Sequence, residues 1–114
     1  MKPLVILAIV AGCSQQAEPP PKPEKPPAIP AAEVQRGLDA CHGYVAKVCV
    51  CAGPAAQEAC ILAKSMPEAI ESGRRVTAYP DSSREDALQA AGSIRKTVKQ
   101  CIEKTAQLSS LGCS

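Results

Sequence analysis

Residues 82–108, SSREDALQAAGSIRKTVKQCIEKTAQL, decide the fold class. The apolar and small side chains in this stretch recur at alternating spacings of four and three, at Ala87, Ala91, Ile94, Val98, Cys101, Thr105 and Leu108. Because an α-helix turns once every 3.6 residues, this spacing places them on one helix face. Ser82 and Glu85 have the spacing of a capping box, which predicts that the helix begins there.

A similar stripe occurs upstream, in the segment that ends at Gly53-Pro54. It consists of Val34, Leu38, Cys41, Val45, Val48 and Ala52. Gly37 and Gly43 weaken this helix, because glycine loses more backbone entropy on folding than other residues do. Gly53 ends it, and Pro54 is well placed in the first turn of the next helix.

The second helical segment also carries a single apolar face, formed by Ala56, Cys60, Ala63, Met66 and Ile70. Pro67 predicts a kink or a restart, because proline removes a backbone hydrogen bond from a helix interior. The capping-box spacing of Ser65 and Glu68 supports a restart. Gly73 is the predicted C-terminal stop, and residues 74–81 are predicted to form a loop.

No window alternates apolar and polar residues for long enough to predict a strand. The sequence therefore predicts an all-α fold, a small antiparallel three-helix bundle over residues 31–114. Its core is thin, because the chain has two Tyr, no Phe and no Trp. A core of Ala, Val, Leu, Ile and Cys buries less area per residue, so the domain is expected to need covalent or metal staples.

The chain begins with the features of an exported leader. Met1-Lys2-Pro3 supplies one positive side chain, and residues 4–11 form a short apolar run. A helix needs about 20 apolar residues to span a bilayer, whereas about 7–15 suffice for the core of a signal peptide. The run leads directly into the tetrapeptide Val10-Ala11-Gly12-Cys13.

This tetrapeptide resembles the lipobox of bacterial lipoproteins, in which an aliphatic residue and two small residues precede the modified cysteine. The resemblance implies that residues 1–12 are a signal peptide and that Cys13 is acylated, which makes membrane lipid a partner. Two or three acyl chains anchor stably, at about 0.8 kcal/mol per buried CH₂. Ser14 after the cysteine favours the outer membrane in Gram-negative lipoproteins. The alternative is an ordinary secretory signal, in which Cys13 is incidental.

Proline dominates the segment after the lipobox, and residues 18–30 read EPPPKPEKPPAIP. Proline fixes φ and removes a donor, so this segment forms neither a helix nor a sheet ladder. Extended polyproline II, at about 3.1 Å per residue, would make it a spacer of roughly 40 Å. Residues 13–30 are therefore predicted to be a disordered, Pro-rich tether, with a ligand for a proline-binding domain as the alternative.

Lipidation of Cys13 leaves six other cysteines, an even number that predicts three disulfides in a small exported domain. In an up-down-up bundle, the end of the first helix, the start of the second and the end of the third share one pole. Most of these cysteines lie within about two turns of that pole. Among the roughly fifteen possible connectivities, this geometry favours Cys41–Cys101, Cys49–Cys60 and Cys51–Cys113.

The alternative for the cysteines is a periplasmic metal or thiol-redox site. Cys49-Val50-Cys51, with the neighbouring Cys41-His42 and Cys60, offers soft ligands that suit copper or zinc. Against this, thiolates outside the cytoplasm tend to oxidise, and no cluster of further His or Met residues supports them. No metal or other cofactor is therefore predicted.

Catalysis and nucleic-acid binding find little support. The formal net charge is only +2, and Lys2 lies in the leader, so no electrostatic case for nucleic acid exists. His42, the chain's only histidine, adjoins Cys41, and adjacent side chains on a helix point about 100° apart. The basic clusters Arg74-Arg75 and Arg95-Lys96-Lys99 are predicted to be solvated, with contact to anionic lipid or polysaccharide as the alternative.

The sequence thus predicts a non-enzymatic envelope protein. It would be anchored to a membrane outside the cytoplasm and would present a small disulfide-bonded helical module there. A binding or a structural role fits this description, and the envelope protein that it would contact is not identified.

Overall fold

The structure is a computed structural model and describes residues 27–113. Within that range the chain forms four α-helices and one 3₁₀ turn: α1 (Ala31–Val48), α2 (Pro54–Ala63), α3 (Ser65–Ala78), α4 (Arg84–Ala106) and η1 (Leu108–Leu111). No strand occurs between residues 27 and 113, so the all-α prediction is confirmed for this part of the chain. The predicted leader, Cys13 and most of the predicted tether lie outside the described residues.

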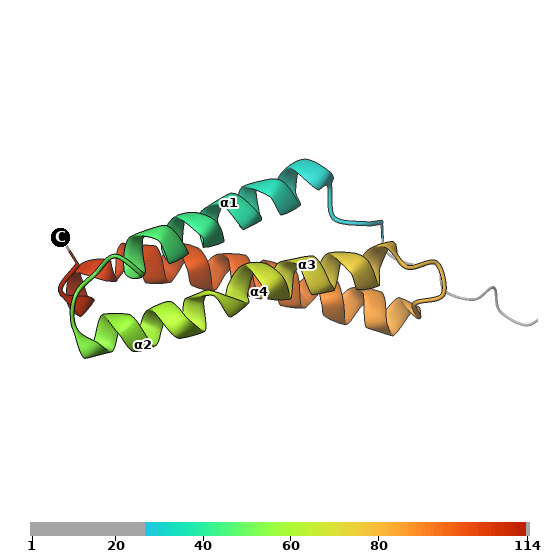
Figure 1. Cartoon of the computed structure of the whole chain (residues 1–114). Coiled ribbons are helices and arrows are strands. Elements are labelled where there is room, and N and C mark those ends of the chain that lie inside the picture. The colour runs from blue at the N-terminus through green and yellow to red at the C-terminus, as the bar shows by residue number, and fades with distance from the viewer. Residues whose placement is uncertain (1–26, 114) are drawn as a thin grey trace, which may run out of the picture.

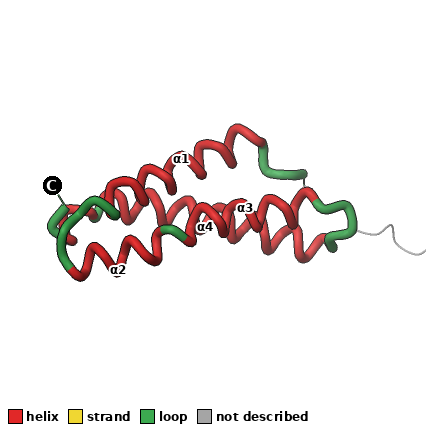
Figure 2. Tube along the Cα trace, viewed as in Figure 1, coloured by secondary structure: helices red, strands yellow, loops and turns green. Residues whose placement is uncertain are grey.

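The helices form three antiparallel arms. α1 runs along the bundle, α2 and α3 follow one another back, and α4 returns alongside them (Figure 1). The break between α2 and α3 is a short interruption within one arm (Figure 2). α3 begins at Ser65, so Pro67 lies in its first turn, where a helix lacks backbone acceptors for its N–H groups. The predicted restart is therefore present, two residues before the proline.

The two ends of the bundle hold different parts of the chain (Figure 1). At one end the C-terminal end of α1, the start of α2 and the segment after α4 lie together. We call this end the stapled pole (residues 48–62 and 106–113). The other end is formed by the turn between α3 and α4, and the start of α1 lies in the same half of the bundle. We call it the tether pole (residues 27–34 and 78–84).

The core consists of two clusters of buried side chains. The larger one lies in the middle of the bundle and toward the tether pole, and contains Ile29, Val34, Leu38, Cys41, Ile70, Ile94 and Cys101. The smaller one lies toward the stapled pole and contains Tyr44, Val48 and Ala63. Met66 packs against both clusters and joins them. The aliphatic packing is therefore concentrated away from the stapled pole.

The folded domain starts before residue 31, where the tether was predicted to end. Ile29, assigned to the tether by its proline-rich surroundings, is buried in the larger cluster. The carbonyl of Pro30 accepts hydrogen bonds from the N–H groups of Glu33 at 2.9 Å and Val34 at 3.1 Å. The last residues of the proline-rich segment thus lead into α1 and cover one end of the core.

The predicted end of the first helix was wrong. α1 ends at Val48 rather than at Ala52, and the N–H of Cys49 closes it on the carbonyl of Val45 at 3.0 Å. Residues 49–53 then form a loop. Gly53 ends this loop with φ of 112°, in the left-handed region that favours glycine.

The predicted end of the second arm was also wrong. α3 passes through Gly73 and continues to Ala78, which shortens the predicted loop. Gly73 is buried against α4, and a Cβ there would lie 2.7 Å from Cγ1 of Ile94. Gly37 lets α1 approach α4 in the same way, because a Cβ there would meet the Val98 side chain. Both glycines serve close helix packing rather than helix termination.

Neither predicted capping box forms. Ser83, one residue beyond the predicted cap, is the N-cap of α4, and its Oγ accepts the backbone N–H three residues later at 3.0 Å. The hydroxyl of Ser82 instead donates to the carbonyl of Val76 at 2.7 Å. Ser65 donates to the carbonyl of Leu62 at 2.7 Å, so it bonds back to α2. Side-chain bonds to earlier carbonyls therefore replace both predicted caps.

Candidate functional site

The six cysteines of the described residues form three disulfides, Cys41–Cys101, Cys49–Cys60 and Cys51–Cys113. These are the three pairs that the helix geometry predicted. The Cα atoms of the pairs are 5.0, 4.8 and 5.4 Å apart, within the ordinary range for disulfides. The pairing links all three arms of the bundle.

The central disulfide joins α1 to α4 inside the larger core cluster. Cys41 and Cys101 are both fully buried, and Sγ of Cys101 lies 3.9 Å from Sδ of Met66. The two residues are 60 apart in sequence. In the chain-entropy treatment, closing a loop of that length stabilises the folded state by about 4 kcal/mol.

The other two disulfides fix the stapled pole. Cys49–Cys60 joins the end of α1 to α2, across 11 residues of sequence. Cys51–Cys113 joins the loop after α1 to the segment after η1, across 62 residues. Cys49 and Cys51 thus bond to different partners, as the favoured connectivity predicted, although both lie beyond the end of α1. Both chain segments that leave helices at this pole are covalently held.

The metal alternative requires thiolates, which the disulfide-bonded protein does not offer. The sulfurs of Cys49, Cys51 and Cys60 are all in disulfides. His42 is exposed on α1, whereas its neighbour Cys41 is buried. Between residues 27 and 113, no three or more His, Cys, Asp or Glu side chains are grouped so as to hold a metal ion. A cysteine–metal site would therefore need the reduced chain.

Several basic side chains pair with acidic ones on the surface. Arg74 lies 2.6 Å from a carboxylate oxygen of Glu71 within α3, and Arg95 of α4 lies 3.3 Å from Glu33 of α1. Exposed pairs of this kind typically contribute about 1 kcal/mol or less. The predicted basic clusters thus lie on a surface of mixed charge. Inside the domain, burial raises the pKa of the Tyr44 phenol above its usual value.

Large apolar side chains are exposed on and beside α2. Val50, in the loop after α1, is 83% exposed, and Ile61 and Leu62 of α2 are 72% and 66% exposed. α2 faces the core with the small residues Ala56 and Ala63 and holds the two large residues outward. Sequence analysis missed this feature. The available signal was that Ile61 and Leu62 lie off the apolar stripe of their helix.

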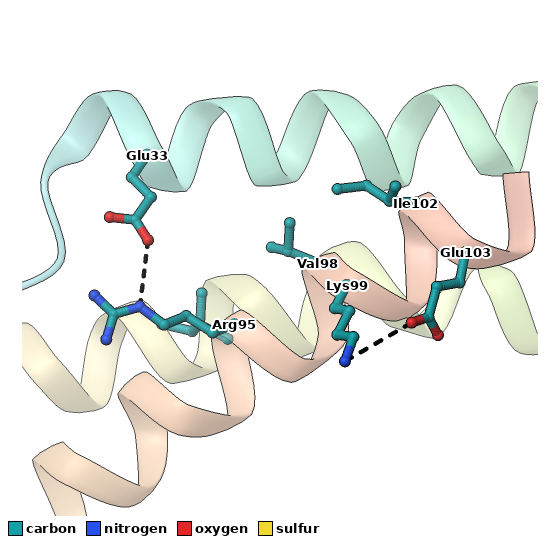
Figure 3. Close-up of a pocket in the computed structure, with 7 residues that line it drawn as sticks. Glu33, Arg95, Val98, Lys99, Ile102 and Glu103 are labelled. Carbon is teal, nitrogen blue, oxygen red and sulfur yellow. Dashed lines mark hydrogen bonds and ion pairs between the residues drawn. The ribbon is translucent and has the colours of Figure 1, made fainter. Parts of the chain in front are cut away.

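A second surface feature lies between α1 and α4. A groove of about 400 Å³ is lined by the apolar residues Ile94, Val98 and Ile102 of α4. Glu33 of α1 and three charged residues of α4 complete its lining (Figure 3). The periodicity of the sequence placed Val98 on the buried stripe but gave no sign of this groove.

Comparison with known proteins finds no match: no family model, no curated protein and no solved structure is detectably similar to this chain. Among the described helices, none is both long enough and apolar enough to cross a membrane.

Proposed function

We propose that this protein is an exported envelope lipoprotein, anchored through acylated Cys13, that presents the stapled pole of its helical domain to an envelope protein. The role proposed is binding or structural rather than enzymatic. The observation that carries the proposal is the polarity of the domain. The chain enters it at the tether pole, while two disulfides and the three most exposed of the large apolar side chains among the described residues lie in the opposite half.

An anchor that precedes Pro27 acts on the domain from the tether pole. α4 runs from that pole to the other and has 23 residues, which is about 35 Å of helix at 1.5 Å per residue. The stapled pole is then the part of the domain farthest from the anchored end. A partner that approaches from outside the membrane surface meets it first.

The chemistry of the stapled half suits a protein partner. Exposed Val50, Ile61 and Leu62 are large apolar side chains of the kind that become buried in protein interfaces. The disulfides hold the loop that carries Val50 and the helix that carries the other two, so little ordering is required on binding. A catalytic role is not part of the proposal, because the oxidised chain offers no thiolate nucleophile beside His42.

Intact mass spectrometry of the membrane-extracted protein, without reducing agent, tests the lipid anchor on Cys13 and the three disulfides together. We expect a chain that starts at Cys13, carries the mass of its acyl groups, and lacks two hydrogens for each of three disulfides. The matched control is Cys13→Ser, which should leave the leader attached and add no lipid. A mature chain that starts elsewhere without lipid would overturn the anchor, and six free thiols would overturn the stapled module.

Photo-crosslinking in intact cells tests the presented pole. A crosslinker placed at Val50 or Ile61 should capture one discrete envelope protein, and a crosslinker at Leu88, exposed on the tether half of α4, should not. The change Leu62→Asp in the same chain should reduce capture through Ile61. Equal capture from all three positions would contradict presentation of the stapled pole.

A further inference from the structure

The three disulfides differ in how well the core shields them. The central one is fully buried in the larger core cluster, so a reductant reaches it only after the helices separate locally. Cys49 and Cys60 are half-buried and pack against the smaller cluster. Cys51 and Cys113 are also half-buried, but neither packs against either of these clusters. Cys51–Cys113 is therefore the disulfide that the core shields least.

Cys51–Cys113 lines a hollow at the stapled pole, with a volume of about 710 Å³. The adjoining residues Val50 and Gly112 are exposed. Among the described residues that line the hollow, Lys47 is the one with a charged side chain. Because a nearby cation stabilises a thiolate, this lining favours the approach of a thiolate nucleophile.

The disulfide also fixes the end of the described chain, which we call the C-terminal segment (residues 107–113). Three N–H groups within this segment donate to carbonyls of the same segment, at 3.0, 3.1 and 3.2 Å. Leu108 and Leu111 pack against the smaller core cluster. Cys51–Cys113 is the covalent bond between the segment and the loop after α1. Breaking it leaves the packing of the two leucine side chains to hold the segment against the core.

The C-terminal segment covers part of the smaller core cluster. Leu111 and Tyr44 line the same small hollow, and Tyr44 is only 3% exposed. If the segment moves away, Tyr44 becomes accessible to solvent and to small solutes. The rest of the bundle stays cross-linked, because the other two disulfides still join α1 to α4 and to α2.

We propose that Cys51–Cys113 is a thiol–disulfide exchange site, which an external dithiol reduces while the other two disulfides stay intact, and that its reduction releases the C-terminal segment from the core. The exchange needs only the folded, oxidised domain and neither the lipid anchor nor the envelope partner. It therefore goes beyond the proposed function, and its test can fail without affecting that proposal.

The exchange takes place in two steps. One thiolate of the dithiol attacks Sγ of Cys113 and forms a mixed disulfide, while the bond to Cys51 breaks and its electron pair passes to Sγ of Cys51, which takes a proton. The second thiolate then attacks the sulfur of the dithiol in this mixed disulfide and displaces Cys113, which is protonated in turn. The dithiol ends as a disulfide, and the domain has gained two electrons and two protons.

The surroundings of the two sulfurs favour Cys113 as the one attacked. Sγ of Cys51 lies 3.1 Å from the carbonyl oxygen of Lys47, and that oxygen repels a thiolate that approaches Cys51. After the exchange, the thiol of Cys51 can donate a hydrogen bond to the same carbonyl. The reduced state therefore has a partner for the thiol that it creates.

Alkylation of the full membrane-extracted protein tests the selectivity. The oxidised protein is treated with limiting dithiothreitol without denaturant, and samples taken over time are quenched with iodoacetamide and mapped by tandem mass spectrometry. Cys51 and Cys113 should be labelled at least about tenfold faster than the other four disulfide-bonded cysteines, which serve as controls in the same molecule. Reduced thioredoxin is the second probe. Reduction by both probes would assign the exchange to protein dithiols as well as small ones, and reduction by dithiothreitol alone would assign it to small dithiols.

Tyrosine fluorescence tests release of the segment. Tyr79→Phe leaves Tyr44 as the single tyrosine of the chain. Acrylamide should quench Tyr44 severalfold more strongly once Cys51–Cys113 is reduced, while circular dichroism shows the helices unchanged. Adding Cys51→Ser and Cys113→Ser to this variant should give the stronger quenching without reductant, and dithiothreitol should not increase it further.

A charge reversal tests the role of the hollow. Lys47→Glu should slow reduction by dithiothreitol severalfold, because the thiolate then approaches a carboxylate. Lys96→Glu makes the same change in net charge on an exposed part of α4 outside the lining of this hollow, and it should leave the rate unchanged.

Three outcomes would overturn the proposal. The first is labelling of Cys49 and Cys60 as fast as that of Cys51 and Cys113. The second is simultaneous reduction of all three disulfides, which would indicate that exchange requires unfolding of the whole domain. The third is unchanged quenching of Tyr44 after Cys51–Cys113 has been reduced.

Discussion

The tether half and the stapled half of the bundle are packed with different material. Toward the tether pole the core holds five aliphatic residues with long or branched side chains, Ile29, Val34, Leu38, Ile70 and Ile94. Toward the stapled pole it holds Tyr44, Val48 and Ala63, with half-buried cysteines around them. Two disulfides lie in that half, Cys41–Cys101 lies between the halves, and none of the three lies at the tether pole.

This difference shows where a chain without Phe or Trp places its covalent bonds. Where aliphatic side chains fill the space between helices, apolar burial contributes roughly 25 cal/mol per Å² and holds the arms together. Where alanine and cysteine take their place, the buried area is smaller. Disulfides then stabilise the fold by restricting the unfolded chain instead. Removing a disulfide and disturbing the aliphatic packing should therefore change the free energy of unfolding by different amounts.

The largest effect is expected from the disulfide between the two halves. Replacing both cysteines, Cys41→Ala with Cys101→Ala, should lower the free energy of unfolding by about 3.5 kcal/mol, because with Cys51–Cys113 intact this bond closes a loop of roughly 24 residues in the unfolded chain. The matched variant, Cys49→Ala with Cys60→Ala, opens an 11-residue loop and should cost about 3 kcal/mol. Urea unfolding followed by circular dichroism measures both. A greater cost for the shorter loop would contradict the entropic account.

A smaller effect, confined to the tether half, is expected at Gly73. Gly73→Ala places a methyl group 2.7 Å from Cγ1 of Ile94 and should destabilise the domain by about 2 kcal/mol through overpacking. Gly92→Ala, on the exposed side of α4, meets no atom within 4 Å and should stabilise it by about 0.5–1 kcal/mol. Thermal unfolding measures the two shifts. If both had the same sign, Gly73 would not be a packing glycine.

The smallest effect should appear at alkaline pH in the stapled half. Burial raises the pKa of Tyr44, so the folded protein holds the phenolic proton after the unfolded chain has released it. This contribution to stability is complete below about pH 10 and is lost as the pH rises through the folded pKa. Tyr44→Phe should therefore show a shallower fall in unfolding free energy between about pH 9 and 11. An identical slope for both proteins would contradict the burial argument.

The helical class, the three-arm order and the disulfide partners were predictable because each depends on local periodicity or on which helix ends meet. The helix ends were not. Whether Gly73 ends a helix or packs inside one depends on Ile94, which is distant in sequence. Ser82 and Ser83 differ only in backbone geometry, and the sequence pattern favoured the wrong one. In the sequence, Ile29 belongs to a proline-rich linker. Its burial depends on side chains distant in sequence, which surround it only in the folded bundle.

The candidate surfaces also differ in whether they could be predicted from the sequence. The disulfides of the stapled pole could be inferred because six cysteines, paired within one bundle, leave few arrangements that helix geometry allows. The groove between α1 and α4 could not, because it depends on how these two helices pack against each other. Local patterns indicate which residues face inward. They do not indicate which small residues leave an open space beside a large one.

The position of Cys41 also limits how the domain responds to mechanical load. If a membrane anchor pulls on Pro27 while a partner holds the stapled pole, the tension enters through the start of α1. Residues 27–40 can be peeled away, because only side-chain packing and hydrogen bonds hold them. At Cys41 the load passes through a covalent bond into Cys101 of α4. Under tension, the first turns of α1 can therefore unfold and extend, while the disulfide-linked remainder of the domain keeps its contact with the partner.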